Sequence, residues 1–204
     1  MMSDYEPNTA YIIIPTVGKI VWIVMATVAG LHFPRGWKRG QVMAKDTENK
    51  GPATMRNILI DNVRGRGAEW FILCDDDTVP PADGVVRLLE HGEKIAAGIV
   101  PLRAHGNPGL VIPEGEEAAK VDWKDGDLIY GDTGAAFMAV HRDVIDAFRG
   151  PWFEKPEGID EGVVFCRKAR ELGFRTLVDC GVACGHVDRE TEEVFYARQH
   201  GRAA

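Results

Sequence analysis

The sequence predicts an α/β fold built on an open, largely parallel sheet with helices on its faces. In its first half, apolar runs of strand length alternate with segments of helical periodicity, the pattern of parallel α/β sheets. The runs are continuously apolar, as expected for strands covered on both faces. The predicted strands are residues 10–15, 41–44, 69–74 and 94–101, and the predicted helices are residues 20–29, 55–63 and 85–89. Ligand sites of such sheets lie beyond the carboxyl ends of the strands.

The second half is irregular before the alternation returns. Residues 102–130 contain recurrent Gly and Pro, and we expect a hairpin or excursion there, with residues 121–123 and 128–130 flanking a turn. Beyond it the sequence predicts strands at 137–140 and 174–178, helices at 141–148 and 160–172, and a charged peripheral helix after Val187.

Length, charge and hydropathy predict one domain without a membrane span. A chain of 204 residues with 45% hydrophobic content can bury a core of its own. Its net charge of -7 gives no bulk electrostatic support for binding a nucleic-acid backbone. The most apolar window, residues 11–30, is interrupted by Pro15, Gly18 and Lys19 and follows acidic residues. We therefore expect a buried strand and helix there, not a membrane span or signal peptide.

The cysteines predict a reducing compartment. Cys74, Cys166, Cys180 and Cys184 are irregularly spaced in a chain long enough to fold without disulfides, so we expect free thiols and a cytoplasmic protein. Cys180 and Cys184 with His186 are a candidate partial zinc site, although no CxxC pair or fourth ligand accompanies them.

Three consecutive carboxylates follow the third predicted strand. Asp75, Asp76 and Asp77 come directly after an apolar run, and two prolines follow shortly afterwards. At a strand end, Asp75 and Asp77 can turn toward the same side, where hard divalent ions such as Mg²⁺ or Mn²⁺ prefer carboxylate and phosphate oxygens. The structural alternative is a solvated acidic turn that precedes a helix.

Other polar residues are candidates for ligand contacts. Arg56 and Asn57 lie in the first turn of a predicted helix with Thr54 as its N-cap, a natural anion site, although such pairs are often only solvated. The small residues 131–136 allow a backbone to approach a ligand, or simply form a tight turn. Asp160 and Glu161 open a later helix, where acidic residues are ordinary partners of the helix dipole.

The order of these pieces resembles a glycosyltransferase of the GT-A fold, most similar to the large family 2 group. The matching pieces are IIIPT (residues 12–16), TMRNILIDNV (54–63), WFILCDDDTVPP (70–81), GDTGAAFMAVHRDVIDAF (131–148), DEGVVFCRKARELGFRTLVD (160–179) and CGHV (184–187). The resemblance covers about residues 10–188. It implies a Rossmann-like nucleotide-diphospho-sugar transferase fold in a single domain spanning 1–204, with a nucleotide-sugar half at about 10–101, an acceptor half at about 102–188 and a peripheral tail at 189–204.

The resemblance also implies roles for individual residues. Asp75 and Asp77 match the ends of the family's DXD motif, which binds a divalent cation and the donor, and His186 matches a C-terminal His that is another metal ligand in many relatives. The implied metal ligands are therefore Asp77, Asp75 and His186. The implied donor-binding residues are Arg56, Asn57, Asp75, Asp76, Thr133 and Gly134.

The departure from the family pattern falls at the catalytic base. Inverting relatives usually place an acidic pair three to four residues before the Phe of a Phe-Cys step, but here Glu161 is followed by Gly162. Either Glu161 or Asp160 takes the proton from the acceptor hydroxyl, or the enzyme works by retention, or the chain is impaired.

The expected function is metal-dependent transfer of a hexosyl or pentosyl group from a nucleotide diphosphate sugar, with uridine diphosphate among the candidate nucleotides. The acceptor hydroxyl belongs to a glycan, a small molecule or a modified nucleic-acid base. One alternative is a non-catalytic nucleotide- or carbohydrate-binding module, which Gly162 favours. A sugar nucleotidyltransferase expects a Gly-rich basic loop where residues 15–19 stand, and a haloacid-dehalogenase phosphatase expects Thr at Val79.

Overall fold

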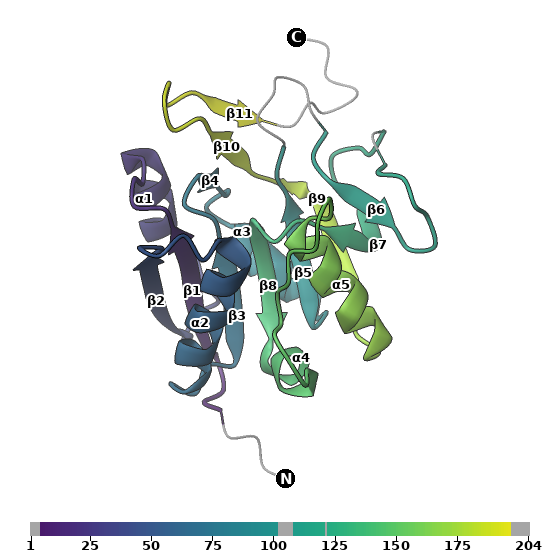
Figure 1. Ribbon diagram of the computed structural model, residues 1–204, viewed down its shortest axis with the longest axis horizontal. Helices are drawn as coiled ribbons and strands as arrows, with labels where there is room; N and C mark the ends of the chain where they lie inside the picture. The colour runs from purple at the N-terminus through teal and green to yellow at the C-terminus, as the bar shows by residue number, and fades with distance from the viewer. Residues whose placement is uncertain (1–4, 102–107, 121, 197–204) are drawn as a thin grey trace.

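The protein has a central sheet of eight strands in the order β2-β1-β3-β8-β5-β9-β7-β6 (Figure 1). The computed structural model describes residues 5–101, 108–120 and 122–196. The strands of the sheet are β1 (Thr9–Thr16), β2 (Lys38–Lys45), β3 (Trp70–Cys74), β5 (Ile95–Ile99), β6 (Val111–Pro113), β7 (Leu128–Thr133), β8 (Phe137–His141) and β9 (Thr176–Ala183). The predicted strands of the first half are thus all present.

The sheet is mixed, because β7 and β8 run opposite to the other six strands. β1 is parallel to β2 and β3, and β5 is parallel to β9, but β8 lies antiparallel between β3 and β5. β7 is antiparallel to both β9 and β6. Six of the eight strands point in the same direction, as a mostly parallel sheet requires, but β7 and β8 make the sheet mixed and not purely parallel.

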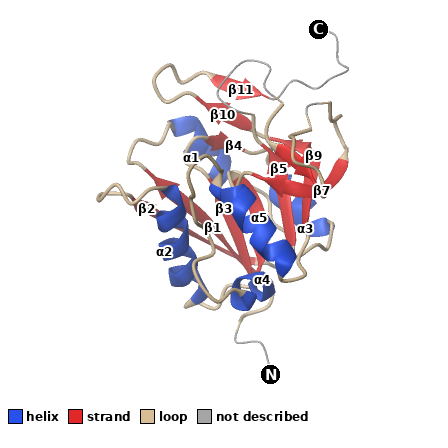
Figure 2. Cartoon of the chain, turned by 45° about the vertical axis from the view of Figure 1, so that its right-hand side comes forward, coloured by secondary structure: helices blue, strands red, loops and turns tan. Residues whose placement is uncertain are grey.

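Helices cover both faces of the sheet and form a layer on each side (Figure 2). The helices are α1 (Trp22–Ala29), α2 (Pro52–Arg64), α3 (Gly84–Glu90), α4 (Arg142–Ala147) and α5 (Glu161–Glu171). Successive strand residues point to opposite faces. Ile13 therefore packs in a cluster with α2, α4 and α5, while Ile12 and Ile14 pack in another with α1 and α3.

A second, three-stranded sheet lies beside the carboxyl ends of the central strands (Figure 1). It consists of β4 (Thr78–Val79), β10 (Gly185–Val187) and β11 (Val194–Tyr196), all antiparallel. The prediction of a helix after Val187 is wrong for the described part of the tail, because residues 188–196 form a turn and a strand. Residues 197–204 lie outside the described ranges.

Two further local predictions need correction. α2 begins at Pro52 with Gly51 as its N-cap at φ 81°, so Thr54 is already inside the helix. The predicted turn at residues 124–127 is present, but the described residues 122 and 123 form no strand, and β7 pairs with β6 instead. Residue 121 is outside the described ranges, and Trp123 is fully buried with its Nε1 donating to the Pro108 carbonyl at 2.8 Å. Of the two forms expected for this segment, a hairpin or an excursion, the structure shows an excursion that buried Trp123 anchors.

The four cysteines are buried free thiols, which confirms that expectation. Burial raises the pKa of Cys166 to about 11 and that of Cys180 to about 12. Across the described ranges, no three His, Cys, Asp or Glu side chains are grouped to hold a metal, which disfavours the zinc site.

No helix in the described ranges has the length and apolarity to cross a membrane.

Candidate functional site

The three aspartates lie in the turn between β3 and β4, at the carboxyl edge of the sheet. The Asp75 amide donates to the Ala136 carbonyl at 2.9 Å, and the Thr78 amide donates to the Asp75 carbonyl at 3.1 Å. Asp76 and Asp77 are buried, with relative exposures of 3% and 5%. Because buried carboxylates need charge or hydrogen-bond partners, the cluster is not a solvated acidic turn.

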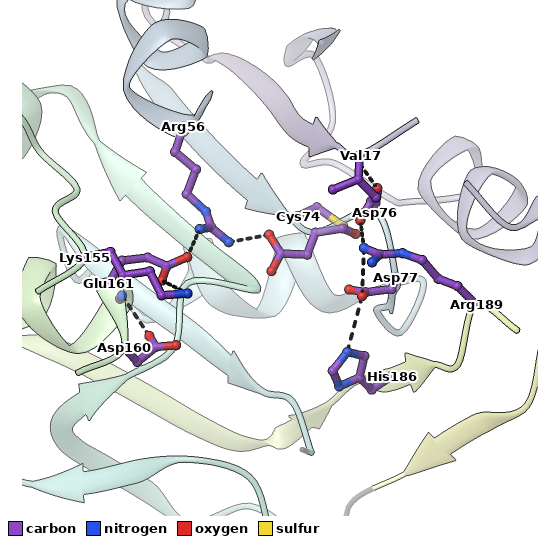
Figure 3. Close-up of polar contacts among 12 residues, drawn as sticks. Val17, Arg56, Cys74, Asp76, Asp77, Lys155, Asp160, Glu161, His186 and Arg189 are labelled. Carbon is purple, nitrogen blue, oxygen red and sulfur yellow. Dashed lines mark hydrogen bonds and ion pairs between the residues drawn. The ribbon is translucent and has the colours of Figure 1, made fainter. Parts of the chain in front are cut away.

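Arg189 and His186 approach the cluster from the β10–β11 hairpin (Figure 3). Arg189 Nη2 forms an ion pair with Asp76 Oδ1 and another with Asp77 Oδ2, the latter at 2.9 Å. His186 Nε2 lies 3.5 Å from the same Asp77 Oδ2, while its Nδ1 lies 2.8 Å from the Pro101 carbonyl. From the other side, the Val17 amide donates to Asp76 Oδ2 at 3.2 Å.

Arg56 joins the cluster to the helix that carries the predicted base. It is buried at 2% exposure, and its guanidinium binds Asp75 Oδ1 and, at 2.6 Å, Glu161 Oε1 (Figure 3). Burial alone would lower the pKa of Arg56, but the two carboxylates outweigh it and raise that pKa. Burial raises the pKa of Asp75, Arg56 lowers it and Asp77 raises it further, for a net upward shift.

Glu161 is an ionised structural partner of Arg56. Burial alone would raise the pKa of Glu161, but the Arg56 guanidinium outweighs it and lowers that pKa. Lys155 Nζ lies 3.7 Å from Glu161 Oε2 and adds a second positive charge. A carboxylate held in this way is a weaker base than a solvated one.

Asp160 has a different environment. It is the N-cap of α5, and its Oδ1 accepts a hydrogen bond from the Gly162 amide at 2.8 Å. The residue is exposed and borders a hollow that also contains Gly134 and His186. Of the two predicted base candidates, Asp160 is the one with an accessible carboxylate.

The packing of α5 accounts for the glycine at position 162. A Cβ atom there would lie 2.6 Å from the Gly134 carbonyl carbon and 2.7 Å from the Thr133 carbonyl oxygen. Contacts below 3.0 Å with backbone require the structure to shift. The first turn of α5 therefore packs directly on the backbone of residues 133–135, and only glycine allows this approach.

Two predicted donor-binding residues, Asn57 and Thr133, form hydrogen bonds within the protein. The Asn57 side-chain amide and carbonyl bond the Phe153 backbone at 2.8 and 2.9 Å, and Asn57 borders a neighbouring hollow instead of the one around the aspartates. The buried Thr133 hydroxyl donates to the Leu110 carbonyl at 2.6 Å. Thr133 and Gly134 both line the hollow beside Asp160.

Two adjoining hollows meet at Asp75 and Glu161, which line both. One, of about 260 Å³, is lined by Thr16, Val17, Asp46, Met55, the three aspartates and Arg189, among others. The other, of about 160 Å³, is lined by Arg56, Gly98, Pro101, Gly134, Asp160 and His186, among others. Both open at the carboxyl edge of the sheet, where the sequence predicted the site.

The residues fit a divalent cation in part. Asp77 and His186 present a carboxylate oxygen and an imidazole nitrogen 3.5 Å apart, a donor pair that suits Mn²⁺. Asp75 instead binds Arg56, so Asp75, Asp77 and His186 do not form one three-residue group within the described ranges. Two protein ligands suffice for an ion that keeps waters and binds substrate phosphates.

Sequence reasoning missed Arg189 and Lys155. Both lie in charged segments that read as solvent-exposed, and their partners are 112 or 113 positions away for Arg189 and six positions away for Lys155. For Arg189, the short apolar run at residues 194–196 is a signal that could have pointed to a returning strand after His186, and hence to a hairpin over the aspartates, in place of the predicted helix.

Comparison with known proteins supports the fold. No protein-family model matches the chain, and no curated protein matches it. The structure of A197 from STIV is similar at a TM-score of 0.64 and 15% identity, covering 96% of this chain and 97% of that chain. The structure of GalNAc-T7 with UDP, GalNAc and Mn²⁺ is similar at a TM-score of 0.64 and 11% identity. The match with GalNAc-T7 covers 91% of this chain and 45% of the GalNAc-T7 chain. GalNAc-T7 is a GT-A glycosyltransferase, and the likeness supports a GT-A-like fold for this protein.

Proposed function

We propose that the protein is a glycosyltransferase that moves a sugar from a nucleotide diphosphate sugar to an acceptor hydroxyl with the help of Mn²⁺ or Mg²⁺. The observation that carries this proposal is the convergence of Asp77, His186 and Arg56 at the carboxyl edge of a GT-A-like sheet. The solved structure of GalNAc-T7, which has this kind of fold, contains UDP, GalNAc and Mn²⁺.

The charge of the larger hollow supports a role for a cation. Among the described residues that line it, Asp46, the three consecutive aspartates and Glu161 are acidic and Arg189 is basic, while Arg56 pairs with Asp75 and Glu161 from outside the lining. A diphosphate entering this lining would meet repulsion unless positive charge accompanied it. A divalent ion held by Asp77 and His186 would neutralise the charge that develops on the leaving diphosphate.

The donor and acceptor would occupy the two hollows. The larger one is lined mainly by residues of the first half, 10–101, and would hold the nucleotide. The smaller one includes Thr133, Gly134 and Asp160 from the second half and would hold the transferred sugar and the acceptor hydroxyl. Placing two reactants side by side in this way converts their reaction into an effectively unimolecular step.

Asp160 would act as the general base in an inverting reaction. Its carboxylate is exposed beside Gly134, whereas Glu161 is tied to Arg56. Glu161 would instead hold Arg56, and Arg56 would hold Asp75 in place for the donor. The buried free thiols suit the reducing cytoplasm, where we place the enzyme.

One observation favours a second candidate, a non-catalytic nucleotide- or carbohydrate-binding module. Arginine side chains already neutralise the buried carboxylates that a transferase would use, through Arg56 on Glu161 and Arg189 on Asp77. A binder of this kind would take up the nucleotide sugar and leave it intact.

Turnover of the donor distinguishes a glycosyltransferase from a non-catalytic binding module. The protein is incubated with Mn²⁺ and a panel of uridine, guanosine, adenosine and thymidine diphosphate sugars, and release of nucleoside diphosphate is followed by ion-exchange chromatography. A transferase releases nucleoside diphosphate from one donor class through slow hydrolysis. A donor that binds without any release supports the binding module, and no binding of any donor contradicts both.

A further inference from the structure

We propose that Arg189 is a latch that occupies the cation position of the aspartate cluster and must leave Asp77 before a divalent ion binds there. Arg189 Nη2 lies 2.9 Å from Asp77 Oδ2, the same oxygen to which His186 Nε2 is 3.5 Å distant. A guanidinium and a metal ion cannot share that oxygen at bonding distance from the same side. The inference rests on the proposed function for the metal and the diphosphate, but the contacts themselves are those of the structure.

The position of Arg189 in the chain suits a group that moves. It lies two residues beyond the end of β10, in the turn of the β10–β11 hairpin (Figure 3). This turn is closed locally, because Asp188 Oδ1 accepts from the Glu190 and Thr191 amides. The hairpin is attached to β4 through two residue pairs and shares no strand with the eight-stranded sheet. Arg189 can therefore leave the cluster without disrupting the central sheet.

The backbones of His186 and Arg189 have different surroundings. His186 lies within β10, pairs in register with Thr78 of β4, and its ring contacts the Pro101 carbonyl. Outside its aspartate contacts, Arg189 is held through its backbone carbonyl, which accepts a bond from Lys19 Nζ at 2.7 Å on an exposed surface. One hairpin thus supplies a metal donor from within a paired strand and a guanidinium from its connecting turn.

Released from Asp77, the Arg189 side chain would bind the donor diphosphate. It already lines the larger hollow together with Thr16 and Val17. Guanidinium groups match phosphate oxygens in geometry and charge. The same residue would thus neutralise the carboxylates in the empty site and the diphosphate in the loaded site, so that the buried charges are compensated in both states.

The latch makes two predictions of opposite sign for Arg189→Gln. Without nucleotide, the variant should bind Mn²⁺ about tenfold more tightly than the wild type, because the competing guanidinium is gone. With Mn²⁺ present at saturation, it should bind the nucleoside diphosphate about tenfold more weakly, because a charged phosphate contact is lost. A general loss of structure would weaken both.

Free Mn²⁺ is measured by its solution electron paramagnetic resonance signal during a titration of wild type, Arg189→Gln and the control Arg64→Gln. Arg64 is a charge-matched control, because it lies in the last turn of α2 and pairs with Asp146, which keeps Arg142 as a partner. Arg64→Gln should match the wild type, and the double variant Asp77→Asn/Arg189→Gln should lose the gained affinity. An Arg189→Gln variant that binds Mn²⁺ no more tightly than the wild type overturns the latch.

The nucleotide titration separates the latch from the proposed function. If no nucleoside diphosphate binds either protein with Mn²⁺, the proposed function fails, while the nucleotide-free Mn²⁺ titration still decides the latch. If nucleoside diphosphate binds both proteins equally, the function survives and the transfer of Arg189 to the diphosphate is overturned.

Discussion

Arg56 of α2 and Glu161 of α5, 105 positions apart in the chain, form a buried ion pair with 2.6 Å between Nη1 and Oε1. The same guanidinium binds Asp75, so this one side chain connects two helix starts to the end of β3. Removing one partner of a buried pair leaves an uncompensated charge and is strongly destabilising. Loss of either partner would therefore destabilise the fold and alter the candidate site.

The Glu161→Gln variant should be about 3 kcal/mol less stable than the wild type at pH 7. The pKa of Glu161 is lowered in the folded protein from its ordinary value of 4.5. Its ionised form thus contributes stability above pH 4.5 that is lost as pH falls through the folded pKa. The stability gap between wild type and variant should be constant from about pH 7 to pH 5.5 and narrow below pH 4.5.

Urea unfolding at a series of pH values measures this gap. Glu157→Gln is the matched control, because Glu157 is exposed in the loop before α5, and it should stay within about 0.5 kcal/mol of the wild type. A gap that does not change between pH 5.5 and 3.5 would show that the charge of Glu161 is not what stabilises the pair.

The Gly162→Ala variant should lose about 2 kcal/mol of stability because its methyl group overlaps the backbone of residues 133–135. Alanine normally stabilises a helix relative to glycine, so the sign of the effect reports the packing. Gly150→Ala is the control, since a Cβ at Gly150 meets no atom within 4 Å. Thermal unfolding of both variants decides the matter, and a Gly162→Ala protein as stable as the wild type contradicts the close approach.

The Asn57→Ala variant should lose about 2 kcal/mol of stability while nucleotide affinity is unchanged. Its side chain makes two hydrogen bonds to the Phe153 backbone, each worth about 1 kcal/mol. Thr54→Ala, one turn earlier on the exposed side of α2, should be near neutral because Thr54 is not the N-cap. Chemical denaturation measures the first effect, and calorimetric titration with nucleotide tests the second. A stable variant with weakened nucleotide binding would restore Asn57 to the donor site.

Much of the central sheet could be predicted because local pattern carries the information. The apolar run before Asp75 indicated a buried strand, and the expectation that ligands lie beyond strand ends pointed to the edge where the hollow of the candidate site lies. The insertion of β8 between β3 and β5 could not be predicted, because strand order depends on pairing between distant segments that no local pattern specifies.

The chemistry of the site was harder to predict than its place. Sequence identified Arg56, Glu161 and His186 as candidates, but not that Arg56 binds Glu161 directly. Arg189 was overlooked because an arginine in a charged tail is usually solvated, and only the short hairpin of β10 and β11 brings it to Asp77. Gly162 read as a missing acid, whereas the structure shows a packing requirement.

Asp160→Asn should separate binding from turnover. The variant keeps an oxygen that can cap α5 but cannot accept a proton at neutral pH. We expect nucleotide affinity within about twofold of the wild type and transfer to acceptor reduced at least about a hundredfold. Steady-state rates at saturating donor test this. An unchanged transfer rate would mean that another residue is the general base, or that the reaction retains the configuration of the anomeric carbon.

The most direct test of the central claim is a thermal-shift measurement with nucleoside diphosphates, with and without Mn²⁺, on wild type, Asp77→Asn and the exposed control Asp83→Asn. A ligand at a hundred times its Kd stabilises the folded state by about 2.7 kcal/mol. The account predicts that one nucleotide stabilises the wild type and the control only when Mn²⁺ is present, and that Asp77→Asn loses this shift. Equal stabilisation of Asp77→Asn, or no stabilisation of the wild type by any nucleotide, would contradict a metal-dependent donor site.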